Sequence, residues 1–216
     1  YPELVTPDSP TQRVGGAALS EFPSVAHAAP MLSLENTYSE DEVREFETRV
    51  RRQLGETPLS YVAEPKIDGL SLSVTYRNGI LSQALTRGDG KTGDDVTQNA
   101  RTIRSLPLAL TPSRAGLKIP ELIEVRGEVY LPRSMFAKLN DERTRNGEEP
   151  FVNPRNAASG AMKLLDSRQV AERGLGLFLY AVARTSGPEP KSHSDALLLM
   201  QDLGLRTNPE NRTCAS

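Results

Sequence analysis

The stretch Tyr61-Val62-Ala63-Glu64-Pro65-Lys66-Ile67-Asp68-Gly69 leads into two β-rich segments, residues 70–76 and 80–86. Asn78-Gly79 separates these two segments, and Asn-Gly between apolar runs is a strong signal for a β-hairpin. We therefore predict a strand over residues 61–66, followed by a hairpin. Lys66 would lie where the first strand runs into a tight Asp-Gly turn.

On either side of this stretch, helices and strands mix irregularly. Ser39 and Glu42 form a capping-box pair before an amphipathic run, which predicts a helix over residues 40–54. We expect further helices over residues 96–103, 134–145 and 195–203, a short helix after Asn153-Pro154, and strands over residues 122–131 and 175–183. Because no βαβ unit repeats, we expect an α+β domain with mostly antiparallel sheets.

The composition is that of an ordinary globular protein and excludes several classes of protein. The 216 residues carry a formal net charge of -2, and 37% of them are hydrophobic. No apolar run approaches the ~20 residues that span a bilayer, and no basic, apolar leader is present, so we expect a cytoplasmic protein without a membrane partner. Cys214 is the only cysteine, which excludes an internal disulfide and a multi-cysteine zinc site.

Lys66 is a candidate nucleophile, although Lys-x-Asp-Gly fixes only three positions and an exposed lysine before a turn is the alternative. An unperturbed lysine has a pKa near 10.4, so only about 0.1% of it is neutral at pH 7.5. Desolvation, neighbouring cations or a metal must favour the amine before it can attack phosphorus. If the strand continues through the motif, Glu64 and Asp68 share a face with Lys66 and can orient the amine or hold ribose or a metal.

Two further groups of residues are candidates for the same site. The loop Thr86-Arg87-Gly88-Asp89-Gly90-Lys91-Thr92-Gly93-Asp94 is rich in glycine, which lets a backbone approach a ligand closely. A connecting turn with positive φ angles is the alternative for this loop. Glu128 lies in an apolar segment, where a buried carboxylate is costly unless it is used or paired. It could contact ribose hydroxyls or a metal, and an edge-strand salt bridge is the alternative.

Six sequence elements, taken in order, resemble the adenylation domain of bacterial NAD-dependent DNA ligases. They are Thr6-Pro7-Asp8-Ser9-Pro10-Thr11, Pro30-Met31-Leu32-Ser33-Leu34-Glu35-Asn36, Glu64 through Gly69, Thr86 through Gly90, Arg126-Gly127-Glu128, and Asn153-Pro154-Arg155-Asn156-Ala157-Ala158. Lys-x-Asp-Gly is shared with ATP-dependent ligases and mRNA capping enzymes, whereas the second and last elements are particular to the NAD-dependent branch. The resemblance runs from about Pro2 to Leu205 and implies a nucleotidyltransferase, ATP-grasp-like fold.

The resemblance implies a role for each matching residue. Lys66 would take AMP from NAD, with Asp68 as its acidic partner, and the adenylate pocket would comprise Ser33, Leu34, Glu64, Arg87 and Glu128. Arg155 and Lys163 would contact nicked double-stranded DNA, although Lys163 stands where the family carries an arginine, so the charge is kept and the fork geometry is lost. AMP would then pass to a 5′ phosphate at the nick, which the 3′ hydroxyl seals in replication and repair while Mg²⁺ stabilises charge.

The family pattern also implies limits for this chain. No Asp-Gly-Val-Val-x-Lys segment follows Leu205, so we expect a partial adenylation domain over residues 1–216, incomplete at its C-terminal end. Residues 1–38 would be an extended lead-in and adenine-contact segment, 39–205 the catalytic core, and 206–216 a tail. Metal ligands stay unassigned, zinc is expected only in a C-terminal part of the parent protein, and we expect a monomer. The alternative function is that of a non-catalytic nucleotide- or DNA-binding remnant.

Overall fold

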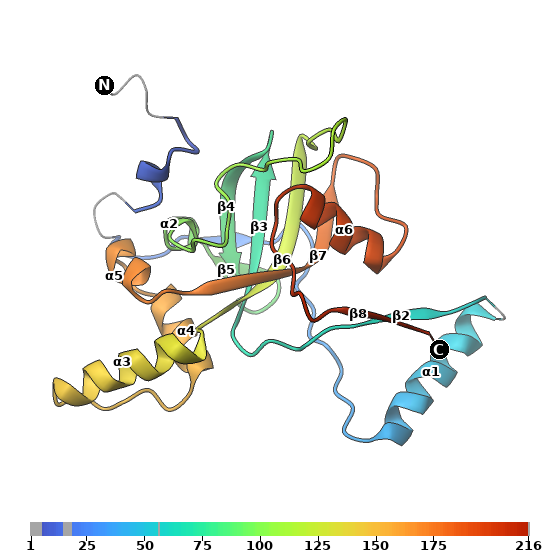
Figure 1. Cartoon of the computed structure of the whole chain (residues 1–216), viewed down its shortest axis with the longest axis horizontal. Helices are drawn as coiled ribbons and strands as arrows, with labels where there is room; N and C mark the ends of the chain where they lie inside the picture. The colour runs from blue at the N-terminus through green and yellow to red at the C-terminus, as the bar shows by residue number, and fades with distance from the viewer. Residues whose placement is uncertain (1–5, 15–18, 56, 216) are drawn as a thin grey trace.

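The computed structural model describes residues 6–14, 19–55 and 57–215, and its centre is a four-stranded antiparallel sheet (Figure 1). The strand order is β4-β3-β6-β7, with β3 at Leu70–Arg77, β4 at Ile80–Thr86, β6 at Leu122–Tyr130 and β7 at Gly176–Thr185. Two small antiparallel ribbons accompany it. One pairs β1 (Ser24–Ala26) with β5 (Thr92–Asp94), and the other pairs β2 (Ser60–Ala63) with β8 (Arg212–Ala215). The prediction of a mixed fold with antiparallel sheets is therefore confirmed.

The hairpin between β3 and β4 forms where the sequence predicts it. Asn78 and Gly79 have φ angles of 47° and 80°, and a two-residue type I′ turn needs positive values at both positions. On its other side β3 pairs with β6 along its whole length, from Leu70 opposite Val129 to Arg77 opposite Leu122. The turn and this long ladder together fix which side chains share a face of the sheet.

One face of the central sheet is apolar and the other is polar. The apolar face carries fully buried side chains such as Leu72, Val74 and Ile123, which belong to the main hydrophobic core. Helices α2 (Thr97–Arg101), α4 (Pro154–Met162), α5 (Ser167–Glu172) and α6 (His193–Asp202) contribute buried residues to that core. On the polar face, the Ser71 and Ser73 hydroxyls on β3 donate hydrogen bonds to the carboxylates of Glu128 and Glu124 on β6. This polar face forms one wall of the cavity described below.

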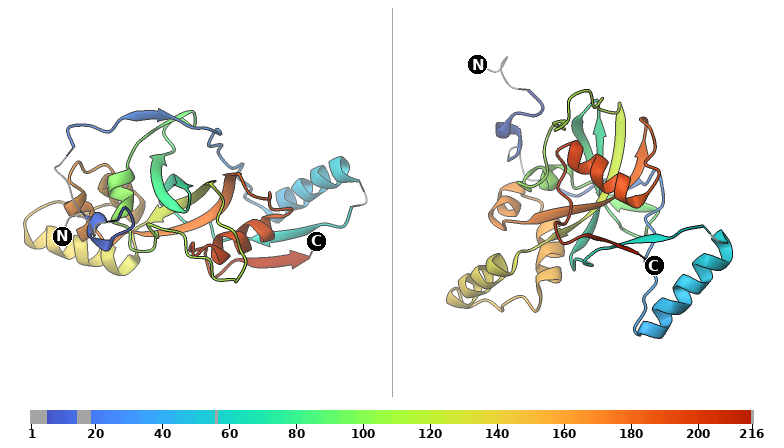
Figure 2. Two further views of the ribbon diagram at one scale, coloured as in Figure 1. Left: turned by 90° about the horizontal axis from the view of Figure 1, so that it is seen from above. Right: turned by 45° about the vertical axis from the view of Figure 1, so that its right-hand side comes forward.

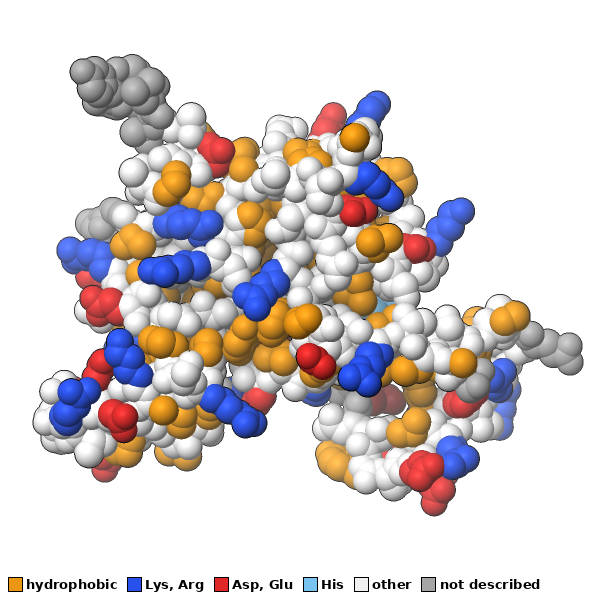
Figure 3. All heavy atoms as spheres, in the orientation of Figure 1, with side chains coloured by type: hydrophobic (Ala, Val, Ile, Leu, Met, Phe, Trp, Pro, Cys, Tyr) orange, Lys and Arg blue, Asp and Glu red, His pale blue; other side chains and the backbone are white. Residues whose placement is uncertain are grey.

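Helix α1 (Glu40–Leu54) begins and ends as predicted, but it packs differently from a core helix. The Ser39 side chain accepts a hydrogen bond from the Glu42 backbone N–H at 3.2 Å, and Gly55 ends the helix at a φ of 68°. None of its residues is buried, and Phe46 is 44% exposed. Figures 1 and 2 show α1 and the β2–β8 ribbon projecting together from one side of the central sheet, and in Figure 3 they form a separate lobe.

Several predicted boundaries need correction. Strand β2 ends at Ala63, and residues 64–68 are irregular, because Pro65 has no N–H to donate to a ladder. The lead-in contains β1 and a short 3-10 helix, η2 (Pro10–Gln12), and residues 206–216 contain β8. Helix α5 was not expected. Helix α3 (Arg133–Arg145) lies within one residue of its predicted position, while α2 is shorter than predicted.

Candidate functional site

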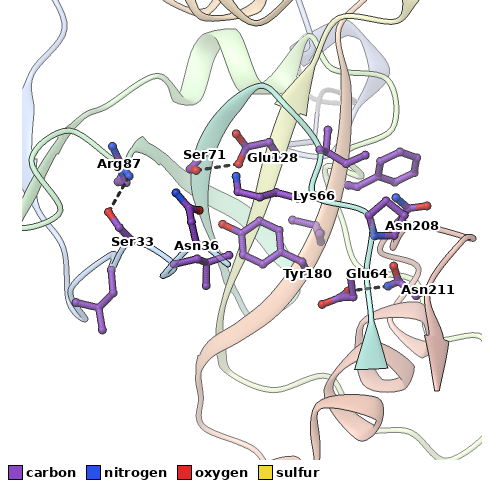
Figure 4. Close-up of a pocket in the computed structure, with 16 residues that line it drawn as sticks. Ser33, Asn36, Glu64, Lys66, Ser71, Arg87, Glu128, Tyr180, Asn208 and Asn211 are labelled. Atoms are coloured by element: carbon purple, nitrogen blue, oxygen red, sulfur yellow. Dashed lines mark hydrogen bonds between the residues drawn. The ribbon is translucent and has the colours of Figure 1, made fainter. Parts of the chain in front are cut away.

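A cavity of about 390 Å³ lies against the polar face of the central sheet, and its size is within the range of small-molecule sites (Figure 4). Its walls come from parts of the chain that are distant in sequence. These are the segment Leu32–Asn36, the segment Glu64–Ile67, the neighbouring strands β3, β6 and β7, the loop residue Arg87 after β4, and the stretch that holds Asn208 and Asn211.

Six of the sequence-predicted site residues line this one cavity. They are Ser33, Leu34, Glu64, Lys66, Arg87 and Glu128. Asp68, Arg155 and Lys163 are not among the lining residues. The residues predicted to bind the nucleotide therefore line the cavity, whereas those predicted to contact DNA do not. Asp68 also lies outside the cavity lining, where it pairs with Arg155.

Lys66 projects from the irregular segment into the cavity and lies beside Glu128 (Figure 4). Three residues further on, the chain turns sharply onto β6 at Gly69. A Cβ atom at Gly69 would lie 1.9 Å from the carbonyl oxygen of Val129, so only glycine fits there. Gly69 has no positive φ angle, and its role is therefore close packing that sets the position of the segment bearing Lys66.

Glu128 lies on β6, an interior strand, and its carboxylate accepts a hydrogen bond from Ser71 Oγ at 2.8 Å. Burial raises the pKa of this carboxyl above its usual value, while the Ser71 hydrogen bond and the positive charges of Lys66 and Arg155 oppose the rise. The alternative of an edge-strand salt bridge is wrong, because β6 has a partner on both sides. Glu128 is a carboxylate placed directly beside the candidate nucleophile.

Arg87 reaches the opposite end of the cavity, where its Nη1 donates to Ser33 Oγ at 3.3 Å. The glycines of its loop allow backbone conformations that other residues rarely adopt, because Gly88 and Gly90 have positive φ angles of 55° and 89°. A Cβ on Gly90 would lie 2.8 Å from the Met31 carbonyl oxygen. The loop is therefore the connecting turn that was the alternative interpretation, and Arg87 is the loop residue that lines the cavity.

Glu64 is held by two side chains that sequence reasoning missed. His193 Nε2 donates to Oε2 at 2.7 Å, and Asn211 Nδ2 donates to Oε1 at 2.7 Å. Nε2 of His193 therefore carries a hydrogen in this contact, because an ionised carboxylate can only accept a hydrogen bond. No local sequence signal marks these partners, which lie 129 and 147 residues beyond Glu64.

Tyr180 and Phe178 supply an aromatic wall that was also missed. Arg126 pairs with Ala181 and Gly127 pairs with Leu179, so Tyr180 is the extra residue of a β-bulge. Bulges commonly redirect a side chain at a functional site. Burial, together with the nearby charge of Glu128, raises the pKa of the Tyr180 hydroxyl. Phe178 stacks on Tyr130 at 5.0 Å between ring centroids, which fixes its ring.

The predicted DNA-contacting residues lie at either end of α4, outside the cavity. Arg155 Nη1 donates to Asp68 Oδ1 at 2.7 Å, and both side chains are more than half exposed. Lys163, the residue after α4, lies 3.7 Å from Asp94. Asp68 is therefore not aligned with Glu64 and Lys66 on one strand face, as was expected, because the strand ends before the motif begins.

The described part of the chain contains no group of three or more His, Cys, Asp or Glu side chains arranged to hold a metal ion. A magnesium ion does not require such a cage, because it commonly binds through one or two carboxylates together with substrate phosphates and water. Glu64 and Glu128 are the carboxylates that line the cavity. In the same residues, no helix has both the length and the apolar character needed to cross a bilayer.

Comparisons with known proteins identify the family of the chain. Residues 19–216 match the model of the NAD-dependent DNA ligase adenylation domain. The chain is 50% identical over 215 residues to the DNA ligase of Herpetosiphon aurantiacus, 51% over 214 residues to that of Marinobacter nauticus, and 48% over 216 residues to that of Desulforamulus reducens. These matches cover 100%, 98% and 100% of this chain, but only 32%, 31% and 31% of the three relatives. The chain therefore belongs to the family of NAD-dependent DNA ligase adenylation domains.

Proposed function

We propose that this chain is the nucleotide-transfer core of an NAD-dependent DNA ligase and that Lys66 carries AMP. One observation supports this most strongly: the Lys66 side chain enters a nucleotide-sized cavity in which five other predicted adenylate-binding residues converge. We also propose that the fold is the nucleotidyltransferase, ATP-grasp-like fold that the resemblance implies.

In the proposed first step, the lone pair of Lys66 Nζ attacks the phosphorus of the AMP half of NAD. A nitrogen–phosphorus bond forms, the pyrophosphate oxygen–phosphorus bond breaks, and nicotinamide mononucleotide leaves with the electron pair. Nζ must release one proton to solvent to become the neutral amine that attacks, and it releases a second proton to solvent as the phosphoramidate forms. Placing Nζ in line with the bond that breaks is the main contribution that the protein makes, because positioning converts the attack into an intramolecular event.

The other cavity residues suit the parts of a nucleotide. Tyr180 offers an aromatic ring on which a base can stack. Phe178 lines the cavity as an apolar contact, because its ring stacks on Tyr130 and the Arg206 guanidinium lies over it. Glu64 and Glu128 are acceptors for hydroxyl or amino groups, and Arg87 is a donor for phosphate oxygens. A magnesium ion held by Glu128 and substrate phosphates would supply charge stabilisation at phosphorus.

The later steps are proposed to use the surface beside α4. AMP passes from Lys66 to the 5′ phosphate of a nick, and the 3′ hydroxyl then displaces AMP. Arg155 and Lys163 are exposed enough to reach DNA phosphates, with side chains 53% and 57% exposed. On the face in Figure 3, basic and acidic side chains are interspersed, so these two residues, rather than a broad basic patch, carry this part of the proposal.

The proposal is tested by incubating the 216-residue chain with NAD and magnesium and measuring its intact mass. We expect a gain of one AMP in the wild-type chain and none in Lys66→Ala. The matched control is Lys118→Ala, because Lys118 is exposed and does not line the cavity. Omission of NAD, or its replacement by ATP, should abolish the gain.

The non-catalytic alternative gives a different result in the same experiment. A remnant that only binds would show a thermal shift with AMP or NAD and no gain in mass. An adduct that survives Lys66→Ala would overturn the choice of nucleophile, and an adduct formed from ATP but not from NAD would overturn the choice of substrate.

A further inference from the structure

We propose that His193 and Asn211 are positioning residues that hold the Glu64 carboxylate in its ligand-accepting orientation and thereby set the affinity of the cavity for its nucleotide. This inference rests on the proposed function of the cavity and adds two residues to it. Each carboxylate oxygen of Glu64 has its own donor at 2.7 Å: His193 on α6 donates to one, and Asn211, just before β8, donates to the other.

Glu64 needs such support because the backbone around it offers little. It is the first residue after β2, and it precedes a proline, which has no N–H to donate. A free glutamate side chain loses substantial rotamer entropy when it is ordered. Its side chain is 25% exposed and lines the cavity, so it is accessible to a ligand while its orientation is set by the protein.

The register of the β2–β8 ribbon places Asn211 opposite Glu64. Ala63 pairs with Arg212, so the next residues outward on the two antiparallel strands are Glu64 and Asn211. The chain before this turn is anchored to the sheet, because the Leu179 N–H on β7 donates to the Arg206 carbonyl at 2.8 Å, and the turn itself is closed by the Asn211 N–H, which donates to the Asn208 carbonyl at 3.3 Å. The position of Asn211 is therefore set by the β2–β8 ribbon and by this anchored segment.

His193 is fixed from another direction. It is the first residue of α6, whose N-terminus is capped by Ser192 through a 3.1 Å hydrogen bond from the Asp195 N–H. Met200, on the same helix, is fully buried in the core. A rigid helix and a tethered turn thus hold the two oxygens of one carboxylate from different sides.

This arrangement predicts an effect on binding rather than on chemistry. Each held oxygen keeps a lone pair for a hydroxyl or amino donor of the nucleotide. Because the carboxylate is already ordered, ligand binding costs less side-chain conformational entropy. Such an interaction acts equally on ground and transition states, so its loss raises the half-saturating NAD concentration and leaves the rate at saturation unchanged.

Two variants of His193 with similar side-chain volume test the histidine. His193→Leu removes the donor, and we expect a rise of about tenfold in the half-saturating NAD concentration, which corresponds to ~1.4 kcal/mol. His193→Gln keeps an N–H donor and should stay within about twofold of wild type. Ser194→Ala, at the exposed neighbouring position, is the control. The rate of adduct formation at saturating NAD should be the same in all four proteins.

Asn211→Asp tests the second donor without changing side-chain size. It places a carboxylate against Glu64, so like-charge repulsion adds to the lost hydrogen bond. We expect a larger rise than for His193→Leu, and none for the control Glu210→Ala, whose side chain is exposed. Thermal melting of each variant checks that the chain is folded before binding is measured.

Binding of AMP to the same variants, measured by calorimetry, separates this inference from the proposed function. If the wild-type chain binds AMP but forms no adduct, the proposed chemistry fails and the inference still predicts about tenfold weaker AMP binding in His193→Leu. The inference is overturned if His193→Leu and Asn211→Asp bind AMP and NAD as wild type does, or if His193→Gln is as impaired as His193→Leu. It is also overturned if the rate of adduct formation at saturating NAD falls in these variants. Failure of the folded wild-type chain to bind either AMP or NAD would overturn it as well.

Discussion

Replacing Gly69 by alanine should damage both stability and adduct formation, because this residue presses the segment that bears Lys66 against β6. The new Cβ would lie 1.9 Å from the Val129 carbonyl oxygen, whereas real Cβ contacts are essentially never shorter than 3.0 Å. The backbones at Gly69 and Val129 must therefore move apart by about 1.1 Å. The nearest backbone is that of the first β3–β6 pair, Leu70 opposite Val129. Overpacking of this kind costs about 1–3 kcal/mol.

For a chain of this size, that cost corresponds to a melting temperature lower by ~2–12 °C. A displacement of the nucleophile by about 1 Å can also slow the reaction by ~10²-fold. Differential scanning calorimetry gives the first quantity, and the initial rate of AMP incorporation gives the second.

Gly160→Ala is the matched control for this experiment. Gly160 lies in α4, and a Cβ there meets nothing within 4 Å. Alanine should stabilise the helix by about 0.5–1 kcal/mol. A Gly69→Ala chain that melts and reacts like wild type would refute the packing argument, as would a Gly160→Ala chain that is destabilised as much as Gly69→Ala.

Three further predictions follow from the charged residues. Because the pKa of Glu128 is raised in the folded chain, its ionised form opposes folding, and its contribution to stability is present at low pH and lost as pH rises through the folded pKa. Glu128→Gln should therefore have a higher melting temperature than wild type at pH 7.5, and this difference should narrow toward pH 5. A lower melting temperature for Glu128→Gln at pH 7.5 would contradict this prediction. A double-mutant cycle of Asp68→Asn and Arg155→Gln, followed by urea unfolding, should give a coupling of only about 0.2–1 kcal/mol, because the pair is largely exposed. Arg155→Gln should weaken binding to nicked DNA and lower the slope of log affinity against log salt by about 1, whereas an unchanged slope would remove Arg155 from the DNA surface.

The parts of the fold that sequence predicts well are those specified by neighbouring residues. The helix after Ser39 is defined by its cap and its apolar spacing, and the turn at Asn78-Gly79 by the positive φ angles that these residues tolerate. Both signals lie within a few residues of the structure that they determine. The strand predicted through Lys66 is wrong for a comparable local reason, since Pro65 has no N–H to donate and the strand ends at Ala63.

The parts of the site that sequence misses depend on pairings between distant segments. Glu64 meets Asn211 because β2 and β8 pair in a particular register, and no periodicity encodes that register. Tyr180 reaches the cavity through a bulge in β7, which alternation of apolar residues does not reveal. Six of the nine residues assigned from the family resemblance line one cavity, and Asp68, Arg155 and Lys163 do not; the roles of all nine in binding and transfer stay predictions.

Mapping the AMP to a single residue tests the central claim most directly. The chain is incubated with NAD and magnesium, digested under neutral or basic conditions that preserve a nitrogen–phosphorus bond, and sequenced by tandem mass spectrometry. We expect AMP on Lys66, within the peptide that contains Glu64 through Gly69, and loss of the label on brief acid treatment. AMP found on any other residue, or an acid-stable linkage, would contradict the claim that Lys66 is the nucleophile.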